Sequence, residues 1–184
     1  MFFGLFRRSP NKALIDKLHG EIMAGARHPN LYLHFGVPDT FEGRFEMLAL
    51  HGALVVRRLN SFEAPGPDLA QDVTDGIFRH LDGTLREMGV GDIVVPKRMK
   101  KHAEAFAGRA LAYGQALDAG DEGALLTALA RNVYGDESRA IAPETRELAH
   151  YIHEVEATLA ARNLEDFLAG RIGFPEPGAT GATS

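Results

Sequence analysis

The spacing of the apolar residues constrains the fold of this chain more than any other feature of its sequence. Over residues 41–59, "FEGRFEMLALHGALVVRRL", apolar residues recur at steps of three and four, which is the period of one face of an α-helix. Leu50 and Leu54 add a second apolar face, so we expect this helix to lie centrally in the fold. Asp39 follows Pro38 just before the stripe and is a suitable N-cap.

The same spacing predicts helices along most of the remaining chain. One apolar stripe covers residues 69–88 and is closed by Gly89, and another covers residues 99–117 and ends before Gly120. Shorter stripes predict further helices over residues 14–22, 125–133, 148–159 and 163–170. Two segments look extended, but neither alternates long enough to predict a strand: 31–35, "LYLHF", and 92–96, "DIVVP". The sequence therefore predicts an all-α fold, a single-domain bundle of about six or seven helices.

The length of the chain fits one domain with a sizeable core, since it has 184 residues of which 45% are hydrophobic. We expect residues 11–172 to form this helical domain. Residues 173–184 are rich in Pro, Gly, Ala and Thr and are expected to form a disordered tail. Residues 1–10 form an apolar and basic N-terminal segment, whose aromatic side chains beside Arg7 and Arg8 suit either a membrane headgroup region or a place on the core.

Composition excludes several classes of protein. Twenty Lys and Arg stand against 25 Asp and Glu, so the formal charge of −5 does not give the overall positive field of a general nucleic-acid binder. The absence of Cys excludes disulfides and thiolate chemistry. The longest apolar window, "LALHGALVV", is interrupted by His51 and is much shorter than the ~20 residues that span a bilayer.

The stretch 81–114 is predicted to be a corner between two helices. Its "GVGDIV" lacks the GK[ST] ending of a phosphate-binding loop, and Gly89 and Gly91 instead permit a tight turn before Pro96 opens the next helix. Four residues opposite the apolar stripe of the incoming helix form a charge ladder: Asp75, Arg79, Asp82 and Arg86. We expect the ladder to be a solvated face, to meet another chain, or to cross to Lys97 or Arg109 and fix the corner.

A basic cluster opens the outgoing helix and consists of Lys97, Arg98, Lys100 and Lys101. Cations at a helix N-terminus oppose the macrodipole at a cost of a few tenths to ~1 kcal/mol, so this placement favours a use in binding. Ribosomal RNA, an anionic lipid surface and an acidic protein face are the candidate partners. An ordinary solubilising cluster is the alternative.

The same region resembles the ubiquinol-cytochrome c chaperone family, whose members are assembly factors of respiratory complex III. The resemblance rests on polar, Gly and Pro positions in register, namely Arg79, Asp82, "REMGVGD" (86–92), "VPKRMKK" (95–101) and "FAGRALAY" (106–113). It extends more loosely upstream and covers most of the chain. Ala107 departs from the larger residue expected in relatives, which affects local packing only.

This resemblance implies a non-enzymatic role without cofactors. The chain is expected to hold nascent cytochrome b during biogenesis of ubiquinol-cytochrome c reductase. The ribosome near its tunnel exit, the anionic inner-membrane surface and a small assembly partner are further expected contacts, and specific DNA is not. The N-terminus lacks an Arg- and Ser-rich transit segment, so we expect a bacterial form that is cytoplasmic and peripheral to the inner membrane.

A holder of cytochrome b needs an apolar groove for helices and a charged rim for loops. The place to look for the groove is between the helices carrying Phe41 and Phe45 and those carrying Phe106 and Tyr113, and the favoured alternative is that these aromatic residues belong to the core. The candidate partner-binding residues are Asp75, Arg79, Asp82, Arg86, Glu87, Asp92, Lys97, Arg98, Lys100, Lys101, Phe106, Arg109 and Tyr113.

Three alternatives remain open at this point. Glu147 and His150 have the spacing used in di-iron bundles, with Asp16 and His19 as the other candidate pair, so a metal site is one alternative. Haem binding through a helical His is the second. A ribosome- or RNA-associated scaffold that uses the basic cluster is the third.

Overall fold

The structure, a computed structural model, describes the backbone of residues 8–178 and the side chains of residues 12–178. This part of the chain is all-α and contains no strand, as the spacing predicts. The helices are α1 (Arg8–Ala26), α2 (Pro29–Leu33), α3 (Phe41–Asn60), α4 (Gly66–Glu87), α5 (Val95–Ala119), α6 (Glu122–Val133), the 3₁₀ helix η1 (Glu137–Ile141), α7 (Pro143–Ala160) and α8 (Leu164–Leu168).

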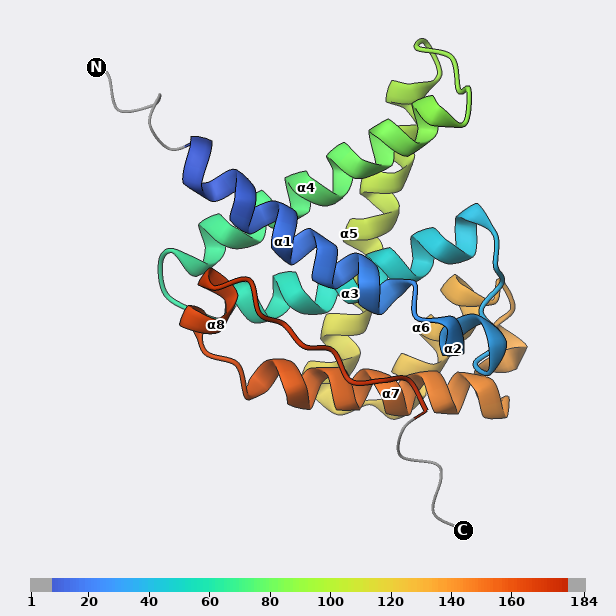
Figure 1. The fold of residues 1–184 in the computed structure, drawn as a ribbon. Coiled ribbons are helices and arrows are strands. Elements are labelled where there is room, and N and C mark those ends of the chain that lie inside the picture. Colours follow the sequence, from blue (N-terminus) through green and yellow to red (C-terminus); the bar gives the residue numbers. More distant parts are fainter. Residues whose placement is uncertain (1–7, 179–184) are drawn as a thin grey trace.

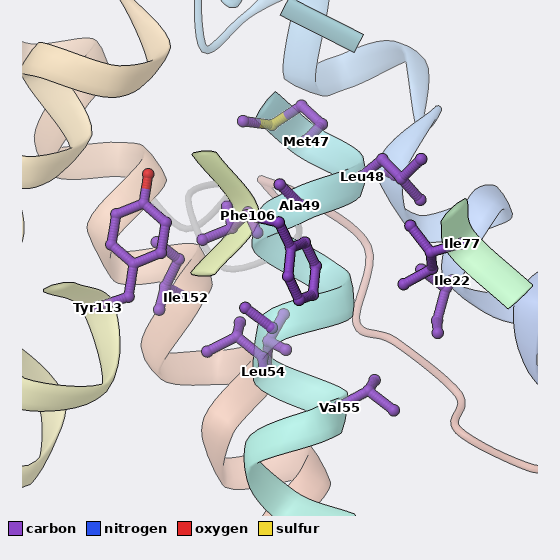
Figure 2. Packing of buried hydrophobic residues seen from close by; sticks show 14 of the residues in the cluster. Ile22, Met47, Leu48, Ala49, Leu54, Val55, Ile77, Phe106, Tyr113 and Ile152 are labelled. Carbon is purple, nitrogen blue, oxygen red and sulfur yellow. The ribbon is translucent and has the colours of Figure 1, made fainter. Parts of the chain in front are cut away.

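Helix α3 is the centre of the bundle. It contacts α1, α4, α5, α6 and α7, and every residue from Phe45 to Val55 is buried. Side chains from several surrounding helices converge on it (Figure 2). The central position predicted from the second apolar face is therefore confirmed, because a helix that is apolar on all sides must be covered on all sides.

The helix ends follow local chemistry, with one correction. Gly89 and Gly120 adopt the left-handed conformation, with φ of 78° and 60°, at the ends of α4 and α5 as predicted. The N-cap of α3 is Thr40, whose hydroxyl accepts a hydrogen bond from the Gly43 amide at 3.1 Å. Asp39 lies one residue too early to cap the helix and pairs with Arg44 at 2.7 Å instead.

Neither of the two segments that look extended is a strand. Residues 31–35 contain the end of α2 and the turn after it, and residues 92–96 contain a turn and the first residues of α5. Both segments lie at helix ends, and a run this short cannot be assigned to a strand or a helix by its period.

Part of the expected C-terminal tail belongs to the fold. The Asn30 side-chain amide donates to the Pro177 carbonyl at 2.9 Å, and the Gly173 amide donates to the Glu21 carboxylate at 3.1 Å. Phe174 packs edge-on against His51 with ring centres 5.1 Å apart. Residues 173–178 are therefore anchored on the helices, which corrects the expected tail boundary. The apolar residues of the N-terminal segment and residues 179–184 lie outside the described part of the chain.

His51 is a fully buried polar residue of α3 with both ring nitrogens hydrogen bonded. Nδ1 lies 2.8 Å from the Met47 carbonyl oxygen and must donate to it, so Nε2 accepts the Tyr151 hydroxyl proton at 2.9 Å. Burial lowers the pKa of His51 to about 4, because the charged ring would lose its hydration. The ring is therefore neutral at pH 7 and belongs to the core.

We expect the neutral His51 to make stability pH-dependent. The unfolded chain protonates this ring near pH 6.5 and the folded chain only near 4, so its stabilisation is complete above 6.5 and is lost as the pH falls toward 4. This predicts a loss of about 2 kcal/mol in unfolding free energy by about pH 5, measured by urea unfolding. His51→Gln keeps a donor and an acceptor but does not titrate, so its pH dependence should be shallower; equal dependence in both proteins would contradict the assignment.

Candidate functional site: the α4–α5 elbow and the adjoining cleft

Helices α4 and α5 meet in an elbow that projects from the body of the molecule (Figure 1). Helix α4 stops at Glu87, Gly89 turns the chain, and α5 begins at Val95. Arg86 holds this turn, since its guanidinium donates to Asp82 one helical turn earlier at 2.7 Å and to Asp92 in the loop at 2.5 Å. The stretch 81–114 is thus two helices joined at a corner, as the sequence predicts.

The charge ladder is only partly connected. Asp82 and Arg86 pair, whereas Asp75 accepts a hydrogen bond from Gln71 at 2.9 Å, and Arg79 is exposed. The expected crossing to Lys97 or Arg109 is corrected, because the ion pair that spans the corner is Arg86 with Asp92. Arg109 lies fourteen residues into α5, about 20 Å along its axis, and is too distant to hold the corner.

The basic cluster lies on the exposed surface at the start of α5. Lys97, Arg98, Lys100 and Lys101 are all exposed. Lys100 approaches Glu104 at 3.8 Å, and among the described residues no ion pair involves the other three. Glu87 and Asp92 are exposed beside them. The cluster is therefore open to an anionic partner, although its role as a contact remains a prediction.

Arg109 is turned toward the core. Its guanidinium makes a two-point contact with the Glu46 carboxylate of α3, with both N–O distances at 2.5 Å. The side chains of Arg109 and Glu46 are 20% and 8% exposed. Burial raises the pKa of Glu46, and the hydrogen bonds from Arg109 offset this only in part. Arg109 therefore joins α5 to α3, and its role as a partner contact stays a prediction.

Phe106 and Tyr113 are core residues, 6% and 1% exposed. Phe106 packs edge-on against Phe78 of α4, with ring centres 5.6 Å apart. The Tyr113 hydroxyl accepts a hydrogen bond from the Asn132 side chain at 3.3 Å. Both rings lie in the packing around α3 (Figure 2). The groove expected between α3 and these two residues is therefore filled, and neither ring is open to a partner in this structure.

An open cleft lies between α1, α3 and α4. Its volume is about 310 Å³. Phe41 and Phe45, which the sequence places at the groove, line it together with Met23, Leu48, Leu81 and Met88. Arg27 and the exposed pair of Asp39 with Arg44 stand at its rim. The apolar site therefore has α3 as one wall, as expected. Its other walls are α1 and α4, whereas α5 was expected.

Sequence reasoning missed three exposed apolar residues at the elbow. Met88, Ile93 and Val94 are 56%, 94% and 45% exposed. Ile93 and Val94 lie outside the stripes of α4 and α5, and an apolar residue outside both stripes was the signal that marks them. Met88 was expected to end the stripe of α4, but the helix stops at Glu87 and leaves its side chain exposed in the turn. Met88 also lines the cleft, so the cleft and the elbow adjoin.

Two histidines of the metal alternative have partners other than its acidic residues: His150 has Glu154 at 3.4 Å, and His19 packs against the ring of His80 with ring centres 4.9 Å apart. Two other candidate ligands are also paired. His153 contacts Glu122 at 2.8 Å, and Glu46 is bound by Arg109. Across residues 12–178 no group of three or more His, Asp or Glu side chains is placed to hold a metal ion. In the same part of the chain, no helix is both long enough and apolar enough to cross a bilayer.

Comparison with known proteins identifies the family. The sequence profile of the ubiquinol-cytochrome C chaperone family matches residues 33–174, which contain α3, α4, the elbow and α5. The chain belongs to this family. The crystal structure of the Cbp3 homolog from Brucella abortus is similar, with 40% sequence identity, a TM-score of 0.82, and coverage of 95% of this chain and 97% of that one. Among curated proteins no sequence matches.

Membership in the ubiquinol-cytochrome C chaperone family implies a non-enzymatic role with a client protein as partner. It confirms the resemblance that the elbow motifs predict. Because the matched region contains α3 and α4, it includes most of the cleft as well as the elbow.

Proposed function

We propose that this chain binds newly synthesised cytochrome b and assists the assembly of ubiquinol-cytochrome c reductase, respiratory complex III. The observation that carries the proposal is the family match over residues 33–174. The likeness to the Brucella abortus Cbp3 homolog over nearly the whole chain supports a shared fold throughout.

The cleft between α1, α3 and α4 is the best candidate for the client contact. A volume of about 310 Å³ is at the lower end of the ~300–1,000 Å³ found for ligand pockets. It suits one or two large apolar side chains and is too small for a whole helix. The charged rim of Arg27, Asp39 and Arg44 would then face the polar residues that flank an apolar client segment.

We propose that the protein works at the cytoplasmic face of a bacterial inner membrane as a peripheral protein. Cytochrome b is a membrane protein, so a chaperone that receives it during synthesis must work where the client enters the bilayer. The ribosome near its tunnel exit and a small assembly partner fit the same place.

Site-specific photo-crosslinking tests the client proposal. A photoreactive residue at Phe41 or Met88 in the cleft should form an adduct with ribosome-bound cytochrome b chains. A residue at the exposed Ile141 of η1, outside the cleft, is the matched control and should form little adduct. Adducts that form only at Ile141 would reject the cleft as the client contact. Absence of adducts at every position would reject cytochrome b as the client.

Salt dependence separates this proposal from an RNA scaffold. Burial of apolar side chains in the cleft predicts crosslinking that changes little between 50 and 200 mM salt. RNA binding through the four cations of the basic cluster would instead weaken by ~10²-fold over the same interval. A loss of that size in the client signal would favour the RNA scaffold.

A further inference from the structure

We propose that the tip of the α4–α5 elbow is a membrane anchor, in which Met88, Ile93 and Val94 enter the headgroup region of an anionic bilayer and the basic cluster binds the phosphates beside them. The inference deepens the proposed function, because it names the surface that positions the chaperone where its client is inserted.

The apolar part of the tip is unusual for its exposure. Ile93 is 94% exposed and flanks Val94, at 45%, while Met88 on the other side of the turn is 56% exposed. All three lie within the turn that projects from the molecule (Figure 1). Neighbouring aliphatic side chains on a projecting turn are not needed by the core, so their exposure indicates contact with an apolar phase.

The net charge of the tip is opposite in sign to that of the whole protein. Residues 86–101 contain five cationic and two acidic side chains, a formal charge of +3, whereas the chain as a whole has −5. One cation, Arg86, is already paired with Asp82 and Asp92, so the cluster at the start of α5 supplies the free positive charge. A positive tip on an acidic protein would orient it toward an anionic surface.

The arrangement of apolar and basic residues at the tip favours a bilayer over RNA. The aliphatic residues are at the end of the projection, and the basic cluster follows within the first two turns of α5. A bilayer has the same order along its normal, because a protein that approaches it meets the phosphates first and the acyl chains behind them. A duplex RNA bound through its phosphates would use the cations but would leave Ile93 without an apolar environment.

The membrane contact and the cleft can operate together. Met88 is the residue where the cleft ends and the elbow begins. A tip inserted at the headgroup level would therefore hold the cleft close to the bilayer surface, where an apolar segment of the client emerges.

Cosedimentation of the full chain with lipid vesicles tests the anchor. The wild-type protein should bind vesicles of phosphatidylglycerol and phosphatidylcholine and should bind pure phosphatidylcholine much more weakly. Ile93→Ser should reduce the partition coefficient about 10-fold, since it removes an apolar side chain from the interface. Ile141→Ser is the matched control, because Ile141 is 77% exposed in η1, away from the tip.

A charge variant tests the second half of the anchor. Lys97→Gln/Lys101→Gln should reduce binding to the anionic vesicles about 30-fold, at ~1 kcal/mol for each cation near the surface. Lys12→Gln/Arg146→Gln changes the net charge by the same amount at two exposed positions outside the tip and should have little effect.

Several outcomes would overturn the anchor. These are no binding of the wild-type protein to anionic vesicles, equal loss in Ile93→Ser and Ile141→Ser, or RNA binding that needs the two lysines while vesicle binding does not. Loss of cytochrome b adducts at Phe41 in Ile93→Ser without any membrane would assign the tip to the client instead. If the tip variants leave vesicle binding intact while those adducts persist, the anchor fails and the proposed function stands.

Discussion

An Arg109→Leu variant is expected to lose about 3 kcal/mol of unfolding free energy. The substitution leaves the Glu46 carboxylate, whose side chain is 8% exposed, without its two-point partner. Removing one partner of a buried ion pair typically costs ~3–5 kcal/mol, because the remaining charge has lost its hydration and gains nothing in return. The lower end applies here because the Arg109 side chain is itself 20% exposed, so water can partly replace it.

Urea unfolding near pH 7 measures this loss, and a double variant shows its cause. Glu46→Leu/Arg109→Leu removes both charges and should recover most of the stability. Arg131→Leu is the matched control, since its pair with Glu137 is 3.8 Å long with side chains 53% and 60% exposed, and its loss should stay below ~1 kcal/mol. A double variant no more stable than Arg109→Leu would contradict the explanation.

Glu46 determines whether the stability deficit of Arg109→Leu grows or shrinks as the pH changes. Burial already raises the pKa of Glu46, and removal of Arg109 should raise it further. A carboxyl whose folded pKa lies above its unfolded value destabilises the fold when it is ionised, so the deficit should shrink as the pH falls through the folded pKa. A deficit that is the same at about pH 7 and about pH 5 would count against Glu46 as its source.

A Gly43→Ala variant is expected to be the most destabilising single-methyl change in α3. A Cβ atom at this position would lie 1.9 Å from the Pro38 carbonyl oxygen, and backbone atoms cannot move away as a side chain can. Overpacking usually costs ~1–3 kcal/mol, and a clash with backbone should reach or exceed the upper value. The chain before α3 must then shift, which also displaces the Thr40 cap.

The unfolding free energy of Gly83→Ala provides the comparison. No atom lies within 4 Å of a Cβ at Gly83, which is inside α4, so the substitution should stabilise the protein by ~0.5–1 kcal/mol. Similar effects of the two alanine substitutions would show that the approach of Gly43 to Pro38 is not a constraint on the fold.

Much of the fold could be predicted from the sequence because helix faces are a local property. A stripe at steps of three and four requires one side of a helix to be buried, whatever covers it. The left-handed glycines Gly89 and Gly120 mark helix ends for an equally local reason. The N-cap of α3 was assigned one residue early, because Asp39 and Thr40 both have capping side chains and only the backbone geometry distinguishes them.

The candidate site depended on contacts between helices, and sequence reasoning was less successful there. It placed the basic cluster on the surface correctly. It named Phe106, Arg109 and Tyr113 as candidate contacts and favoured the core for the two rings, and the structure buries both rings and binds the guanidinium to Glu46. Periodicity tells which residues share a face but not which element that face meets.

The sequence by itself determined the helical class, the corner at Gly89 and the family, because each depends on residue types at fixed short spacings. Tertiary structure alone decided that α3 shares its open cleft with α1 and α4 and that Ile93 stands in water at the end of a projecting turn. The physical reason is that burial depends on which helices pack together, and that packing joins residues far apart in the chain.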